Sequence, residues 1–236
     1  MRRGRAARLE APRAAPSDRL SDPDLLRRGY DDGRLAPVLI LACGALAHEI
    51  VALTRANGWD HVRLHCLPAI LHNHPERIAP AADAALDAIP HERAFLAYAD
   101  CGTGSALAAL CERRGIEMIR GPHCYAFYEG VERFAERDEM TAFYLTDFLV
   151  RQFDAFVWEP LGLDRHSELR DQYFGRYETL VYQAQTDDPA LTEMAERHAE
   201  RMGLGFERRV TGYGELASAV TNAATTPARG SAAPSP

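Results

Sequence analysis

Short apolar runs alternate with segments of helical periodicity through the first half of the chain. Four runs have the length and composition of buried parallel strands, at residues 38–42, 61–67, 94–99 and 116–119. Three intervening segments carry apolar positions at helical spacing, at residues 45–55, 75–88 and 105–113. This order predicts a parallel sheet with right-handed crossovers, and therefore an α/β fold of the Rossmann-like, three-layer type.

The second half is expected to be more helical. The pattern predicts strands at residues 178–184 and 206–210, and helices at 131–137, 146–158 and 189–202. The aromatic segment 143–145 is interpreted as the connection between the first two of these helices. Residues 36–221 are therefore predicted to form a single α/β domain, with a division into two lobes, 36–130 and 131–221, as the alternative.

Both ends of the chain are predicted to be disordered tails. Residues 1–35 contain proline and glycine without sustained periodicity, and residues 222–236 are of low complexity. The arginine-rich start lacks the apolar stretch of a secretory signal, although an organelle transit peptide would have a similar composition. A cytoplasmic protein is expected.

The composition of the chain argues against several classes of partner. The net charge of -7 gives no basic face for nucleic acid, and no apolar run approaches the roughly 18 residues of a membrane helix. The five cysteines are odd in number and irregularly spaced, which is not typical of a disulfide framework. Metal binding, thiol chemistry and plain core packing remain open for them.

Cysteine and histidine recur where the predicted strands end. Cys43 follows the first strand, His72 lies in the loop after the second, Cys101 follows the third, and His123 and Cys124 follow the fourth. Because ligands of open parallel sheets bind outside the carboxyl ends of the strands, we expect these side chains to meet at one edge. Cys66 and Cys111, inside a strand and on a helix, are instead assigned to packing.

Thiolate and imidazole donors favour a soft metal, with zinc first and an iron–sulfur centre next. Three cysteines and one histidine would close a tetrahedral zinc site, whereas two cysteines and one histidine would leave a position open for catalysis. Glu49, on the first helix, is the candidate acid, base or additional ligand, although a solvated carboxylate explains it equally well. Core packing remains the alternative for each cysteine taken alone.

Glycines accompany two of these cysteines. Gly44 follows Cys43, and Gly102 and Gly104 follow Cys101, so backbone and cofactor could approach each other closely there. A glycine-rich turn before a helix also suits an anion, but Gly102 and Gly104 alone do not make a dinucleotide-binding motif.

The motifs of this chain resemble those of the DUF1638 family of uncharacterised prokaryotic proteins. The resemblance rests on segments 41–44, 71–77, 98–104, 121–124, 143–146 and 185–189, and it covers about residues 37–216. It implies a cytosolic α/β protein with a metal-type site, linked to corrinoid-dependent methyl transfer. Family members often carry an aspartate between the last histidine and cysteine, whereas here His123 and Cys124 are adjacent, which makes His123 the weakest of the candidate ligands.

Three functions follow as expectations. The first is a metal-dependent protein of one-carbon metabolism, with a corrinoid protein or a small molecule as partner. It would be an enzyme if an acid–base group stands beside the metal. The second is a metal or corrinoid carrier or sensor without turnover. The third is a thiol-redox protein, which needs two cysteines in contact. The aromatic-rich second half is expected to cover the site or to form the interface of a homo-oligomer.

Overall fold

A computed structural model describes residues 20–226 of the chain. It corrects the predicted tail at residues 1–35, because residues 20–35 are part of the fold. Helix α1 (Asp22–Arg27) buries Leu25 and Leu26, and strand β1 (Tyr30–Asp31) pairs antiparallel with a strand of the main sheet. The earlier part of that tail, with most of its arginines, lies outside the described residues.

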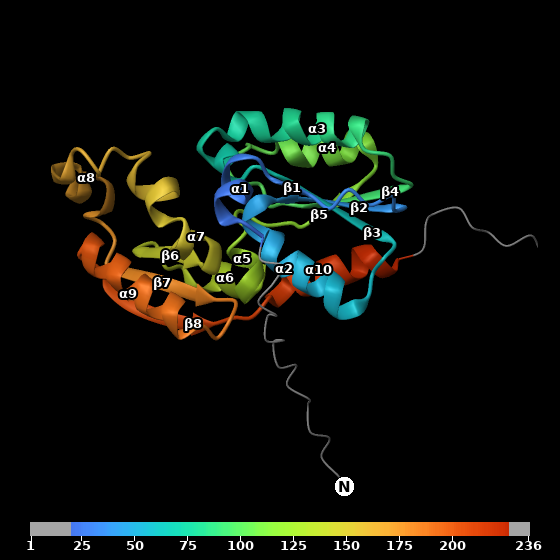
Figure 1. Cartoon of the computed structure of the whole chain (residues 1–236). Helices are drawn as coiled ribbons and strands as arrows, with labels where there is room; N and C mark the ends of the chain where they lie inside the picture. Colours follow the sequence, from blue (N-terminus) through green and yellow to red (C-terminus); the bar gives the residue numbers. More distant parts are fainter. Residues whose placement is uncertain (1–19, 227–236) are drawn as a thin grey trace, which may run out of the picture.

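The main sheet has five strands in the order β1-β3-β2-β4-β5 and is parallel except for β1. Its other strands are β2 (Val38–Cys43), β3 (Val62–Leu67), β4 (Arg93–Ala97) and β5 (Glu117–Met118). Helices α3 (Ile78–Ala88) and α4 (Ala106–Arg114) cover one face, and α2 (Ala47–Asn57) and α10 (Gly214–Thr225) cover the other (Figure 1). The predicted Rossmann-like α/β class is confirmed.

Helix α10 was missing from the sequence prediction, and it corrects the second tail. It buries Leu216, Val220 and Ala224, one helical turn apart, against the first sheet. The predicted boundary at residue 221 therefore falls inside a packed helix, and only residues 227–236 of that tail lie outside the described part of the chain.

A second, smaller sheet follows in the chain, with three parallel strands in the order β6-β7-β8. These are β6 (Ala142–Thr146), β7 (Thr179–Ala184) and β8 (Gly205–Val210), with α9 (Pro189–Met202) packed on them. The aromatic segment 143–145 is therefore a strand and not a helix connection. The helix expected at 146–158 is divided into α7 (Asp147–Arg151) and a π-helical turn (Asp154–Trp158).

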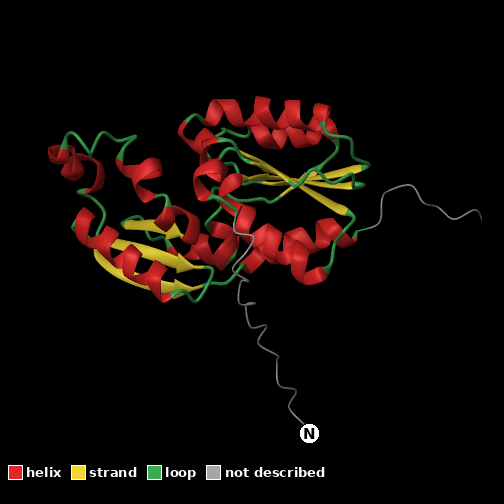
Figure 2. Ribbon diagram, in the orientation of Figure 1, coloured by secondary structure: helices red, strands yellow, loops and turns green. Residues whose placement is uncertain are grey.

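The two sheets lie in separate lobes, each with its own hydrophobic core (Figure 2). We call the five-stranded sheet with its helices the first lobe, and the three-stranded sheet with α7, α8 (Arg170–Phe174) and α9 the second lobe. The short helices α5 (Ala126–Glu129) and α6 (Val131–Arg137) lead from the first to the second. Because α10 returns to the first lobe, the second lobe is inserted between α6 and α10.

An ion-pair cluster connects the lobes on one side. Asp22 of α1 accepts hydrogen bonds from His48 Nε2 at 2.6 Å and from Arg151 Nε of α7 at 2.5 Å. Burial raises the pKa of Asp22, but His48 and Arg151 lower it more, so the net pKa lies below its usual value. Phe148 of α7 is buried in the first lobe's core. Helix α7 is therefore held against the first lobe.

Candidate metal site

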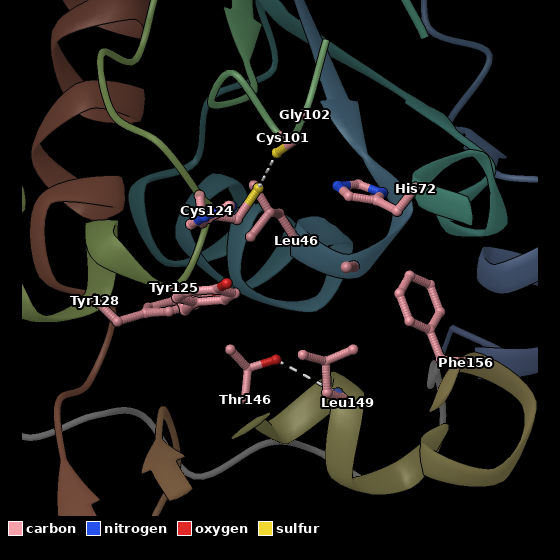
Figure 3. Close-up of a pocket in the computed structure, with 12 residues that line it drawn as sticks. Leu46, His72, Cys101, Gly102, Cys124, Tyr125, Tyr128, Thr146, Leu149 and Phe156 are labelled. Atoms are coloured by element: carbon pink, nitrogen blue, oxygen red, sulfur yellow. Dashed lines mark hydrogen bonds between the residues drawn. The ribbon is translucent and has the colours of Figure 1, made fainter. Parts of the chain in front are cut away.

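Three predicted ligands meet where the strands of the first sheet end. The Cys101 and Cys124 sulfurs lie 3.3 Å apart, and one ligand atom from each of His72, Cys101 and Cys124 lies within 4.8 Å of the others (Figure 3). The amides of Asp100 and Cys101 donate to the carbonyls of Gly121 and Pro122, both at 3.0 Å. These two bonds hold the loops after β4 and β5 together, and so bring the two sulfurs into contact.

The orientation of His72 is set by the backbone. It lies on a 3-10 turn (Ala69–Asn73) that directly follows β3, and its Nδ1 is 3.0 Å from the Ala69 carbonyl oxygen. Because a carbonyl only accepts, Nδ1 carries the hydrogen and the lone pair of the neutral ring is on Nε2. Figure 3 shows a ring nitrogen of His72 facing the two cysteine sulfurs. A backbone partner on the second nitrogen is the usual arrangement of a metal-binding histidine.

Cys43 lies on the other side of the imidazole. Its sulfur is 3.7 Å from Nδ1 of His72, accepts the Ala45 amide at 3.3 Å, and is fully buried. It is not one of the three residues whose ligand atoms gather within 4.8 Å. The structure therefore separates Cys43, which contacts the ring from behind, from the other two cysteines.

His123 is brought to the same edge but not into the cluster. Its side chain is exposed and stacks on Tyr125, with ring centroids 5.0 Å apart. Partial desolvation by the neighbouring residues lowers the pKa of His123 below its ordinary value. Adjacent residues point their side chains in different directions here, so Cys124 faces the cluster while His123 contributes to the wall beside it.

The glycine turn after Cys101 is occupied by the chain's own carboxylate. Asp100 Oδ1 accepts the Ser105 amide at 2.7 Å and the Thr103 hydroxyl at 3.1 Å, and the amides of Gly102 and Gly104 also lower its pKa. The amides that were expected to suit an anion are thus directed at Asp100. Cys101 itself adopts a left-handed conformation with φ 48°, and Gly102 lines the cavity described below.

Gly44 is small for a reason within the fold. A Cβ at this position would lie 2.4 Å from the Leu25 carbonyl oxygen and 3.1 Å from that of Leu67. The close approach is therefore between Gly44 and the backbone of α1 and β3, rather than between Gly44 and a cofactor.

Glu49 is buried in α2, with one carboxylate oxygen, Oε2, that has no hydrogen-bond partner. Burial raises the pKa of Glu49 to about 7, and nearby Asp147 adds to the effect. Glu49 is not among the described residues that line the cavity, although its charge influences Tyr128, which does. It stands beside the site and not in its wall.

Tyr98, at the end of β4, was not singled out from the sequence. It is fully buried, its ring stacks on His72 with centroids 6.1 Å apart, and its hydroxyl has no hydrogen-bond partner. Burial and the surrounding cysteines, Cys43 first, raise its pKa. The only sequence signal was its position three residues before Cys101, on a strand already expected to be buried.

The cluster opens into a cavity of about 270 Å³ between the lobes. The first lobe supplies the cluster and most of the wall, and the second lobe supplies Thr146, Leu149 and Phe156 (Figure 3). The rest of the lining is largely apolar or aromatic: Ala45, Leu46, Gly102, His123, Tyr125 and Tyr128. The aromatic residues of the second half were expected to cover the site, and Phe156 does so.

The donor set suits a soft metal in distances and in chemistry. Tetrahedral zinc with ordinary bond lengths needs ligand atoms about 3.6–3.8 Å apart, so the observed separations require shifts on the order of 1 Å. The hydrogen bond between Cys101 and Cys124, together with burial, raises the pKa of the Cys101 thiol. Metal binding would therefore displace a proton from this pair.

Fold and site together define a two-lobed α/β protein with a Cys₂His cluster at the lobe boundary. The chain belongs to the DUF1638 family, described as a protein of unknown function, whose profile matches residues 66–220. No curated protein and no solved structure matches the chain. Within the described residues, no helix has both the length and the apolar character needed to cross a membrane.

Proposed function

We propose that this protein binds one soft metal ion, with zinc as the first candidate, through His72, Cys101 and Cys124. The observation that carries the proposal is the convergence of these three donors on the wall of a largely apolar cavity. Two cysteines and one histidine leave one position of a tetrahedral ion open, which is the arrangement of a catalytic site rather than a structural one. Cys43 is then not a ligand itself, and its sulfur contacts Nδ1 of the ligand His72.

Methyl or one-carbon transfer is the reaction that we propose for this site, in a cytoplasmic setting. A soft metal lowers the pKa of a bound thiol and keeps it nucleophilic at neutral pH, which is the chemistry that such a transfer uses. The chain's own contribution is to orient His72 through Ala69, to hold the two cysteine loops together, and to exclude water with Leu149 and Phe156.

The size of the cavity limits which cofactor could bind inside it. Pockets for drug-sized ligands are roughly 300–1,000 Å³, and a corrinoid is larger than such ligands. A cavity of about 270 Å³ therefore favours a small ligand inside and a corrinoid, where one is involved, on a partner protein. An iron–sulfur cluster is disfavoured as well, because it normally uses four protein ligands, and among residues 20–226 three donors gather here.

The test is elemental analysis of protein purified without oxygen. We expect about one equivalent of metal in the wild type, and its loss in Cys101→Ser and Cys124→Ser. Cys111→Ala, which removes a buried thiol from α4, is the matched control and should keep the metal. Cys43→Ala should also keep it. Absence of metal after reconstitution, or equal content in all variants, would refute the proposal.

A carrier or sensor without turnover uses the same ligands and is the alternative to an enzyme. An enzyme needs an acid–base group at the metal, and Glu49 is the residue that the sequence predicts for this role. Glu49→Gln should abolish turnover and leave the metal in place if that role is right. Unchanged turnover would assign Glu49 to the fold alone.

A thiol-redox function is a second candidate, and the 3.3 Å contact between the Cys101 and Cys124 sulfurs favours it. Oxidised glutathione would take two electrons and two protons from these thiols, forming one disulfide and two molecules of reduced glutathione. Mass spectrometry after alkylation of metal-free protein measures this. A disulfide between Cys101 and Cys124 that forms readily in the metal-free protein and reverses with dithiothreitol would support it.

A further inference from the structure

The cavity beside the cluster has a lining without charge other than the cluster itself. Its described lining residues include no aspartate, glutamate or arginine, and the chain contains no lysine. Apart from the cluster, the lining residues with polar side chains are Tyr125, Tyr128, Thr146 and His123, and partial desolvation lowers the pKa of His123. A ligand that carries a charge away from the cluster would lose the hydration of that charge here without gaining an ion pair.

The walls define the shape of what fits. The Tyr125 ring stacks on both His123 and Tyr144, and these contacts restrict its orientation. Figure 3 shows Tyr125 and Tyr128 on one side of the cavity and Phe156 on the opposite side, with the cysteines and His72 along one edge. The cavity is larger than the roughly 150 Å³ that encloses one benzene ring, and its 270 Å³ leaves room for a ring with a short side chain.

From these observations we infer that the cavity binds a small uncharged thiol, with an apolar or aromatic body between Tyr128, Leu149 and Phe156 and its sulfur directed at the three-donor cluster. The inference rests on the proposed metal site and names its ligand. On binding, the thiol S–H bond breaks, its proton passes to solvent, and the sulfur forms a bond to the metal. A thiol is the donor that matches both a soft ion and an apolar enclosure.

The test compares two thiols that differ by one carboxylate group. Phenylmethanethiol and 4-(mercaptomethyl)benzoate carry the same thiol group on the same ring, and only the second has a carboxylate. In full-length protein loaded with cobalt(II), Cys101 and Cys124 already give a thiolate charge-transfer band in the near ultraviolet, so binding of an added thiol is reported by an increase in that band, and calorimetry gives the affinity. We expect phenylmethanethiol to bind at least tenfold more tightly than the benzoate.

A variant locates the binding. Leu149→Asp places a carboxylate in the cavity wall and should weaken phenylmethanethiol at least tenfold without changing the metal content. Val210→Asp adds the same charge at an exposed position on β8 and should change neither. Leu149→Gln, uncharged and of similar size, controls for damage to the fold.

The outcomes separate the two proposals. Three results would overturn the inference and leave the metal site standing: equal affinity for both thiols, no increase in the charge-transfer band when phenylmethanethiol is added, or unchanged affinity for phenylmethanethiol in Leu149→Asp. Absence of bound metal in the wild type would overturn both, and the elemental analysis identifies that case directly.

Discussion

Replacement of Glu49 by glutamine tests whether this buried carboxyl is held protonated by the fold. Its pKa in the folded protein is about 7, because burial removes the water that would stabilise the charged form and Oε2 has no partner. In the unfolded chain the pKa returns to its ordinary value of 4.5. Between these two values the folded state binds a proton that the unfolded state has lost.

The free energy of unfolding of the wild type should therefore fall as the pH rises from 4.5 to 7. The difference between the two pKa values, at about 1.4 kcal/mol for each pH unit, amounts to about 3 kcal/mol. Of this, about 2.5 kcal/mol falls between pH 5 and pH 8. Glutamine does not ionise, so Glu49→Gln should lose this dependence and become more stable relative to the wild type as the pH rises.

Urea unfolding at pH 5 and pH 8 measures the change. Trp59 lies in the first lobe's core and Trp158 in the second's, so a Trp158→Phe background makes tryptophan fluorescence report the first lobe. Glu112→Gln, exposed on α4, is the control and should follow the wild type. Parallel pH profiles for the wild type and Glu49→Gln would refute the reasoning, since every other titrating group is common to them.

Three further substitutions probe the same structure, each measured by urea unfolding of metal-free protein. Tyr98→Phe removes a buried hydroxyl that has no partner and should raise the free energy of unfolding by about 1 kcal/mol; a loss would mean that the hydroxyl is satisfied in the folded protein. Asp147→Ala removes the acceptor of four hydrogen bonds, from Tyr182, Gln185 and Thr186. It should lower the free energy of unfolding by about 3 kcal/mol or more, and a loss under about 1 kcal/mol would contradict this expectation. Leu216→Ala should cost about 2–5 kcal/mol by opening a cavity under α10, whereas the exposed Leu35→Ala should cost almost nothing; equal effects would show that α10 does not seal the core.

Periodicity was sufficient to predict the first sheet, because parallel strands buried on both faces leave continuous apolar runs such as the one that forms β2. It failed for β6, because its aromatic residues Phe143 and Tyr144 are only partly buried and the strand therefore lacks the same contrast. It also failed for α10, where alanine and threonine dominate: the pattern predicts no element at residues 214–221, and residues 222–225 fall in the predicted low-complexity tail. Its apolar stripe is visible only once the sheet that it covers is known.

The candidate site divides in a similar way. The rule that strand ends share one edge brought Cys101, Cys124 and His72 together correctly in position, since parallel order fixes which loops are neighbours. It does not determine side-chain direction, so it could not separate Cys43 or His123 from the cluster. Nor could it foresee that the glycine turn is closed by Asp100, because a carboxylate hydrogen-bonded to amides five residues away leaves no periodic signal.

The return of α10 to the first lobe affects the order in which the protein matures on the ribosome. Translation runs from the amino to the carboxyl end, so all three strands of the second sheet are synthesised before the helix that completes the cover of the first. The sheet that begins earlier is thus enclosed later, when Leu216 and Val220 of α10 pack against it. Until then the nascent chain exposes an apolar sheet face, which makes this interval the one in which a chaperone would have most to bind.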